Sequence, residues 1–134
     1  MIDTTSTHPD PFELARAAAA RLAELTGVTE HHLALILGSG CLPAGEACGP
    51  ASAEIETTDL PGFHAAGVAG HAGRIRSVRV GQSNVLVFLS RTHYYEGKGV
   101  RAVVPPIRTA AAAGCRAVVL TNGCGGLKEA WTPG

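Results

Sequence analysis

Aromatic side chains are scarce in this chain of 134 residues: one Trp, two Tyr and three Phe make up 4% of the sequence. A hydrophobic core must therefore be built from Ala, Val, Leu and Ile. Apolar residues still account for 46% of the chain and the mean hydropathy is +0.16, which argues against a disordered chain. The length fits one domain with a core of its own.

An excess of charge of one sign is also missing, because 11 basic and 11 acidic side chains cancel. A nucleic-acid-binding protein normally carries a basic face, so we expect no nucleic-acid partner. No apolar run approaches the roughly 20 residues that cross a bilayer. No positively charged leader precedes an apolar stretch either. We therefore expect a cytoplasmic protein without a membrane partner.

Close-spaced cysteine pairs are absent as well. The chain has four cysteines and no C-x-x-C motif among them. Zinc sites generally need such pairs, so we expect no metal site. In a reducing compartment these thiols are expected to be small buried or loop residues rather than disulfides.

The signals for a helix start coincide at residues 10–13. Asp10 can cap the first turn, Pro11 suits the first helical position, and Glu13 can reach back to the cap. Gly27 is a suitable stop. Apolar residues recur between them at helical spacing and predict one buried stripe: Phe12, Ala15, Ala18, Ala19, Leu22 and Leu25. Residues 1–9 show no periodicity and are expected to form a flexible tail.

Several short apolar runs predict strands. Residues 33–37 read as a strand covered on both faces, and residues 116–121 as another buried strand. Residues 75–80 alternate like a strand with one wet face, and with residues 85–89 they predict a hairpin.

Residues 100–113 predict a helix that Pro105 and Pro106 start, kink or interrupt. Residues 41–70 are rich in Gly, Pro and Ala and are expected to form a surface excursion, with one short element near Ile55 left open. This order predicts an α/β protein.

Three loops each follow a predicted strand, where ligands of open α/β sheets gather. The first is Gly38-Ser39-Gly40. Its glycines allow the backbone to approach an anion, and Ser39 adds a hydroxyl donor. Taken alone, the triplet is better explained as a plain glycine turn, and the further residues of a dinucleotide fingerprint or a P-loop are missing.

The second loop contains Arg91, His93, Tyr95 and Glu96. In an extended loop, Arg91, His93 and Tyr95 point to one side. A guanidinium, an imidazole and a phenol on one side suit an oxyanion beside a sugar hydroxyl. Glu96 can orient a histidine and fix its tautomer. A solvated loop with surface aromatics is the alternative.

The third loop is Asn122-Gly123-Cys124-Gly125-Gly126, whose backbone amides can form an anion nest. Asn122 capping a turn is the structural alternative. Cys124 has no His or Lys beside it, which disfavours a nucleophilic role. His71, between glycine-containing turns, is a further candidate. The remaining histidines have no surrounding motif and are expected at the surface: His8, His31, His32 and His64.

The ordered set of motifs resembles the trimeric purine nucleoside phosphorylases: Gly38-Ser39-Gly40, Gly70-His71-Ala72-Gly73, Arg91-x-His93-x-Tyr95-Glu96-Gly97 and Thr121-Asn122-Gly123-Cys124-Gly125-Gly126-Leu127. The resemblance implies a mixed β-sheet flanked by helices, of the nucleoside phosphorylase/hydrolase-like kind. Residues 10–134 would form the N-terminal half of such a domain. It also implies a pentosyltransferase of purine salvage that splits purine (deoxy)ribonucleosides with phosphate into free base and (deoxy)ribose 1-phosphate. Inorganic phosphate would be the co-substrate, with no metal or organic cofactor, and the full-length family suggests a homotrimer.

The resemblance also implies residue roles. Ser39, Arg91, His93 and the Gly123 amide would hold phosphate, with His71 beside them. Tyr95 would touch the ribose and Cys124 the base or sugar. Glu96 and Asn122 would support the loops. Many family members have Ala-Ala where this chain has Gly123-Cys124, which changes the base pocket.

In the family, the purine-gripping carboxylate and amide come from the C-terminal half, which this sequence does not contain. We therefore expect a truncated sheet with an exposed edge, and a poor or inactive catalyst. A non-catalytic phosphate-binding remnant is the alternative from another class. A methylthioadenosine phosphorylase-like fragment is the nearest enzymatic rival, and Asn122 with Tyr95-Glu96-Gly97 disfavours it.

Overall fold

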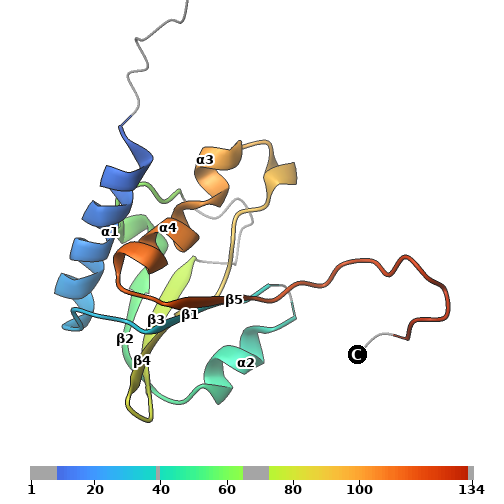
Figure 1. The fold of residues 1–134 in the computed structure, drawn as a ribbon, viewed down its shortest axis with the longest axis horizontal. Helices are drawn as coiled ribbons and strands as arrows, with labels where there is room; N and C mark the ends of the chain where they lie inside the picture. The colour runs from blue at the N-terminus through green and yellow to red at the C-terminus, as the bar shows by residue number, and fades with distance from the viewer. Residues whose placement is uncertain (1–8, 39, 65–72, 133–134) are drawn as a thin grey trace, which may run out of the picture.

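The computed structural model describes residues 9–38, 40–64 and 73–132, and these form a five-stranded mixed sheet flanked by helices (Figure 1). The strand order is β2-β3-β4-β1-β5, in which β2–β3 and β3–β4 are antiparallel and β1 runs parallel to β4 and β5. The predicted mixed sheet is thereby confirmed. The strands are β1 (Leu33–Ile36), β2 (Ala51–Glu56), β3 (Arg74–Val80), β4 (Ser83–Phe88) and β5 (Ala117–Leu120).

Helices cover both faces of this sheet. α1 (Pro11–Thr26) and α4 (Pro105–Ala112) lie on one face, and α2 (Leu42–Ala47) lies on the other (Figure 1). The short α3 (Val100–Val103) precedes α4, and the predicted interruption falls between them because Pro105 starts a new helix. No helix in the described part of the chain is long and apolar enough to cross a bilayer.

The Asp10 cap and the Gly27 stop of α1 form as the sequence predicts. The Asp10 carboxylate accepts a hydrogen bond from the Phe12 amide at 3.0 Å. Gly27 ends the helix with a φ of 72°, a left-handed conformation that favours glycine, and donates to Ala23 at 2.9 Å. The prediction that Phe12 belongs to the buried stripe is wrong. Its ring is 58% exposed and lies under the Arg108 guanidinium, 4.9 Å from the ring centre.

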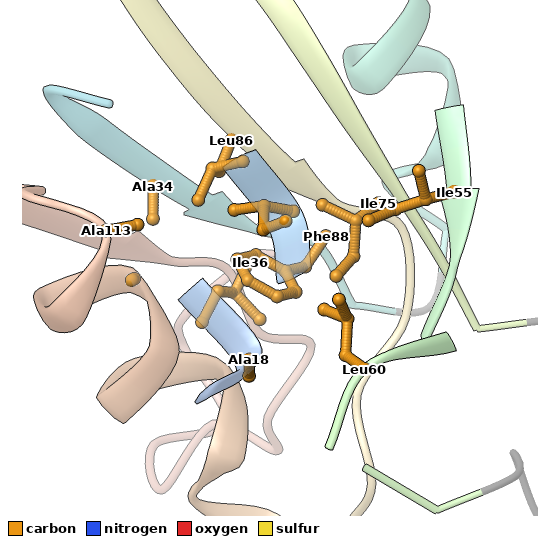
Figure 2. Packing of buried hydrophobic residues seen from close by; sticks show 11 residues of the cluster. Ala18, Ala34, Ile36, Ile55, Leu60, Ile75, Leu86, Phe88 and Ala113 are labelled. Carbon is orange, nitrogen blue, oxygen red and sulfur yellow. The ribbon is translucent and has the colours of Figure 1, made fainter. Parts of the chain in front are cut away.

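The main core lies between the sheet and the pair α1 and α4. Ala18 of α1 and Ala110 of α4 are fully buried against it. Burying one large apolar side chain stabilises a fold by about 1.5–3 kcal/mol, so this cluster supplies much of the driving force. Figure 2 shows how its large side chains from neighbouring strands meet: Ile36, Ile75, Leu86 and Phe88.

The segment 41–70 differs from the expected excursion. It contains α2, β2 and a 3₁₀ turn, η1 (Thr57–Asp59), within its described part. The element left open near Ile55 is β2. A helix at residues 42–47 was missed because it packs through Gly45, where an added Cβ would lie 2.8 Å from Leu89 Cδ2. A helix that packs through a glycine leaves no apolar stripe in the sequence.

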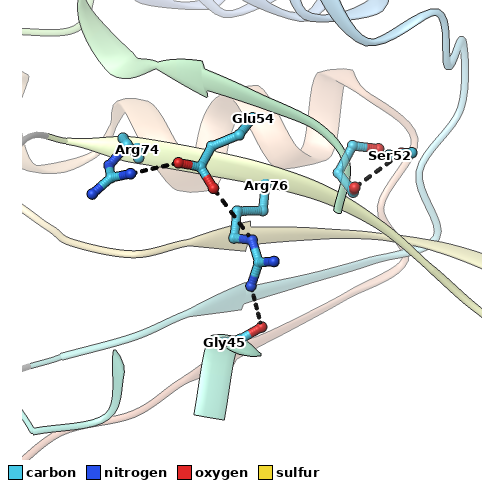
Figure 3. A network of polar contacts seen from close by, with 6 residues as sticks. Gly45, Ser52, Glu54, Arg74 and Arg76 are labelled. Carbon is cyan, nitrogen blue, oxygen red and sulfur yellow. Dashed lines mark hydrogen bonds and ion pairs between the residues drawn. The ribbon is translucent and has the colours of Figure 1, made fainter. Parts of the chain in front are cut away.

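Polar contacts fasten β2, β3 and α2 together (Figure 3). Glu54 pairs with Arg74 at 2.6 Å and with Arg76 at 3.4 Å. Arg76 Nη1 also donates to the Gly45 carbonyl at 2.7 Å. Arg76 therefore links the sheet to α2, and the predicted wet face of β3 is largely covered there.

Residues 116–121 contain the expected strand, but the expectation that this strand is buried is wrong. β5 pairs with β1 only, among the described strands, and lies at the sheet edge. Val119 is 47% exposed and Leu120 is 56% exposed. The expected exposed edge is therefore present. After β5 the chain runs away from the sheet (Figure 1).

His31 is not at the surface, contrary to the expectation for the histidines without a motif. It is 1% exposed, and its Nε2 lies 3.0 Å from Ser77 Oγ. His32 is half-buried, and its Nδ1 accepts a hydrogen bond from the Asn84 amide at 3.0 Å. His64 is exposed as expected, and His8 lies outside the described residues.

Candidate functional site

The carboxyl ends of β1, β4 and β5 meet at one edge of the sheet because β1 runs parallel to both neighbours. The Gly38 amide, after β1, donates to Thr121 Oγ1 at 2.9 Å. Arg91, after β4, donates from Nη1 to the Thr121 carbonyl. A Cβ on Gly38 would lie 3.0 Å from Arg91 Nη2, so glycine makes room for the guanidinium.

The loop after β4 is not extended throughout, and an extended loop was the condition for Arg91, His93 and Tyr95 to point to one side. Residues 94–96 form a 3₁₀ turn, η2 (Tyr94–Glu96), which Gly97 ends with a φ of 75°. Glu96 Oε1 accepts from the His93 amide at 2.8 Å and lies 3.4 Å from His93 Nδ1. Lys98 Nζ lies 3.1 Å from Glu96 Oε2. Glu96 thus holds the loop and the histidine together.

The charge of Glu96 is stabilised where it lies. The hydrogen bond from the His93 amide, followed by that from Lys98, lowers the pKa of the Glu96 carboxyl from its ordinary value. A carboxylate that is ionised at neutral pH accepts a proton donor, so it favours a proton on His93 Nδ1.

The other nitrogen of His93 faces Arg91. Arg91 Nε lies 3.5 Å from His93 Nε2, and a guanidinium has donors only, so Nε2 is the acceptor in this arrangement. These two contacts fit a proton on His93 Nδ1. An oxyanion placed beside Arg91 and His93 would take over the guanidinium donors, and the imidazole would donate to it with a proton on Nε2.

A cavity of about 280 Å³ opens at this edge of the sheet. Arg91, His93 and Glu96 line it, as do Gly38 and Gly40 on either side of Ser39. Apolar side chains complete the wall, among them Leu42, Phe63 and Phe88. A few polar groups on a mainly apolar wall are typical of small-molecule sites.

Tyr95 is not a lining residue of this cavity. Its side chain is 84% exposed. Its ring stacks on His93, with ring centres 4.8 Å apart and an angle of 19° between the planes. His93 and Tyr95 lie side by side as predicted, but Tyr95 does not line the cavity in the described structure.

The third loop does not reach the cavity. Asn122, Gly123 and Cys124 are exposed, and none of them lines it. Residues 121–132 extend from β5, and Leu127 is 94% exposed (Figure 1). An anion nest needs packing that holds its amides in place, yet a Cβ added to Gly123 would meet no atom of the described residues within 4 Å. The four thiols of the chain are free, including that of Cys124.

Ser39 and His71 lie outside the described residues. Their described neighbours Gly38, Gly40 and Gly73 line the cavity. Among the described residues, no three His, Cys, Asp or Glu side chains are grouped so that they could hold a metal ion.

Sequence reasoning missed residues of the cavity that carry no motif. Thr57, Phe63 and His64 reach it from the segment after β2. Thr121, which directly follows β5, ties together the chain after β1 and the chain after β4. Thr121 opens the motif of the third loop in the sequence, but nothing in the sequence indicated this role.

The sequence of this chain is similar to those of known proteins. A family model described as "Phosphorylase superfamily" matches residues 32–134. The chain is 53% identical over 130 residues to a protein of Cellulomonas sp named purine nucleoside phosphorylase, covering 93% of this chain and 46% of the relative. It is 50% identical over 120 residues to the purine nucleoside phosphorylase of Mycobacterium tuberculosis, covering 90% of this chain and 45% of the relative.

The fold is similar to solved structures of the same name. The purine nucleoside phosphorylase from Schistosoma mansoni in complex with acetate aligns with a TM-score of 0.75 at 27% identity, over 90% of this chain and 43% of that chain. The same organism's enzyme in complex with inosine aligns with a TM-score of 0.72 at 28% identity. The chain thus spans less than half the length of the relatives it matches, in line with the expected correspondence to about half of a family member.

Proposed function

Since the chain belongs to the phosphorylase superfamily, we propose that it binds inorganic phosphate at the carboxyl ends of β1 and β4, as the phosphate half of a purine nucleoside phosphorolysis site. The observation that carries this proposal is the convergence of Arg91 and His93 in one cavity beside Gly38. A guanidinium, an imidazole and a glycine turn suit a tetrahedral dianion. Ser39 and His71 are proposed as further phosphate ligands from their positions in the sequence.

Purine nucleosides are the proposed second substrate. Relatives about 50% identical to this chain carry the name purine nucleoside phosphorylase, which supports this choice over a methylthioadenosine phosphorylase. In the proposed reaction a phosphate oxygen forms a bond to the ribose C1′ while the glycosidic C–N bond breaks. The electron pair leaves on the purine, which takes up a proton. Phosphate is the co-substrate, and no organic cofactor or metal is required.

The chain's own residues would aim and desolvate the nucleophile. Positive charge builds on the ribose as the bond breaks, and a phosphate dianion held close to it stabilises that charge. Glu96 acts through His93 and is therefore a positioning residue. Tyr95 is proposed to contact the ribose. The Gly123 amide, Cys124 and Asn122 take part when the segment after β5 packs over the cavity. The homotrimer and the cytoplasmic location stay predictions.

A non-catalytic phosphate-binding chain is the second candidate. The exposed position of residues 122–124 favours it, because this loop would supply contacts to base and sugar. Catalysis also needs the leaving purine to be held, and binding of phosphate alone does not do this.

Phosphate binding is tested by titration calorimetry on the 134-residue chain. Removing a charged hydrogen-bonding group costs about 1.5–3 kcal/mol, so Arg91→Ala is expected to weaken phosphate binding by roughly 10- to 100-fold. Arg91→Lys keeps the charge and should retain part of the affinity. Arg16→Ala is the matched control, because Arg16 is exposed on α1 and pairs only weakly with Glu13 at 3.8 Å. Equal affinity in the Arg91 and Arg16 variants would contradict the proposal.

Phosphorolysis of inosine separates the two candidates. Turnover by the chain in phosphate buffer supports the enzyme. Phosphate-dependent thermal stabilisation without turnover supports the binding chain, since a ligand at 100 times its Kd stabilises by about 2.7 kcal/mol. If the chain shows neither turnover nor phosphate-dependent stabilisation, both candidate functions are excluded.

A further inference from the structure

A second cavity, of about 290 Å³, lies between the start of α1, the turn after η1 and the helices α3 and α4. Prolines from three of these segments line it: Pro11, Pro61 and Pro105. Leu14 and Ala15 of α1 add to the apolar wall. Its volume is close to the lower end of the range of small-molecule sites, about 300 Å³, so it suits a small and mainly apolar ligand.

Two guanidinium groups line the same cavity, those of Arg101 and Arg108. No acidic side chain is among its lining residues in the described part of the chain. Arg101 is exposed and Arg108 is half-buried over the Phe12 ring. Neither arginine forms an ion pair with a carboxylate of the described residues. The cavity is therefore positively charged.

A buried hydroxyl without a partner lies in the wall of this cavity. Thr109 of α4 is 1% exposed and lines the cavity. Its Oγ1 is buried and has no hydrogen-bond partner among the described residues. Buried polar groups are nearly always hydrogen-bonded, and an orphan calls for an explanation. Because this oxygen is buried, a ligand in the cavity does not reach it, and the orphan hydroxyl is a feature of the packing of α4.

From the apolar wall and the two arginines we propose that the second cavity binds an organic phosphate with a small, flat apolar group. The two arginines hold the phosphate dianion, because guanidinium groups bind phosphate with paired hydrogen bonds. The apolar group lies against the proline rings and Leu14. The arginines give orientation, and the apolar wall gives affinity.

This site is separate from the cavity at the carboxyl ends of β1 and β4. Arg91 and His93 line the first cavity and not the second, while Arg101 and Arg108 line the second and not the first. His64 lines both, so the two cavities are neighbours. The second site does not depend on the proposed phosphorolysis, and its arginines can be changed without touching Arg91.

Phenyl phosphate is the probe, because it joins a dianion to a flat apolar ring. We expect amide shifts of Leu14, Gly62 and Thr109 when it is titrated into the ¹⁵N-labelled chain. Inorganic phosphate and phenol, each lacking one half of the probe, should bind at least tenfold more weakly at these residues. Shifts confined to the neighbourhood of Arg91, or no binding of phenyl phosphate, would overturn the proposal.

Variants give the second readout. Arg101→Gln and Arg108→Gln should each lower the affinity for phenyl phosphate tenfold or more. Arg116→Gln is the matched control, an arginine outside the cavity, and should leave it unchanged. Thr109→Val should leave the affinity unchanged, because the Thr109 hydroxyl is buried, and should raise the melting temperature of the free chain, because it removes the orphan hydroxyl and keeps the shape. Unchanged affinity in both Gln variants, or an equal loss in Arg116→Gln, would overturn the site.

Discussion

Acidification should destabilise this chain through His31. The imidazole is 1% exposed between α1 and β1, and its Nε2 contacts Ser77 Oγ at 3.0 Å. Burial, and secondly the charge of His32, lowers the pKa of His31 from 6.5 to about 4. The folded state therefore holds His31 neutral at a pH where the unfolded chain already binds a proton.

The sign and size of the effect follow from these two values. The stability contributed by neutral His31 is complete above pH 6.5 and is lost as the pH falls towards about 4. A difference of about 2.5 pKa units at about 1.4 kcal/mol per unit gives a loss of about 3.5 kcal/mol. The free energy of unfolding of a small domain is about 5–15 kcal/mol, so this loss is a large share of the stability.

Urea unfolding between pH 7.5 and 4 measures this directly. His31→Gln keeps a hydrogen-bonding side chain but does not titrate, so the free energy of unfolding should lose most of its slope over this range. His64→Gln is the control, because His64 is exposed and its replacement should leave the slope in place. Identical slopes in the wild-type chain and His31→Gln would refute the reasoning.

Three further outcomes follow from single contacts. Gly73→Ala should destabilise the chain by about 1–3 kcal/mol in urea unfolding, because its Cβ would overlap Thr57 Oγ1. The Glu96 carboxylate accepts a hydrogen bond from the His93 amide, and its pKa is lowered. In NMR spectra recorded against pH, the chemical shift that this hydrogen bond gives the His93 amide should therefore be lost only below pH 4.5, as the pH falls through the folded-state pKa of Glu96. Thr109→Val should raise the free energy of unfolding by about 1 kcal/mol or more, since it removes a buried orphan hydroxyl.

Each of these has a matched control. Gly123→Ala should be neutral, because nothing lies within 4 Å of its added Cβ. The transition of the His93 amide should disappear in Glu96→Gln. Thr109→Ser retains the hydroxyl and loses a methyl group, so it should not stabilise. A stabilising Thr109→Ser, a destabilising Gly123→Ala, or a transition that persists in Glu96→Gln would contradict the respective interpretation.

The elements that the sequence predicted well are those with a local physical cause. α1 has a cap at Asp10, a stop at Gly27 and an apolar stripe between them, and all three act within the helix itself. The β3–β4 hairpin follows from alternation around a short turn at Gly81. The interruption of the helix at Pro105 is a property of proline alone.

The failures concern properties that only the folded chain has. β5 has the composition of a buried strand, yet its exposure depends on which strands lie beside it. The burial of His31 depends on Ser77, 46 residues away. The motifs correctly brought Arg91, His93 and Glu96 to one cavity, because strand order and a local turn place them. They did not place Gly123, because its loop has no packing partner among the described residues.

The link between the Gly38 amide and Thr121 Oγ1 joins residues 83 positions apart in the chain. Residues 38–121 are the shortest stretch that contains both ends of this link, so the placement of Arg91 beside Gly38 depends on the docking of β5 on β1. The affinity for the proposed phosphate would therefore report how completely the sheet has assembled. By mass action, a bound anion would in turn slow the detachment of that last strand, and hydrogen exchange of the β5 amides would register it.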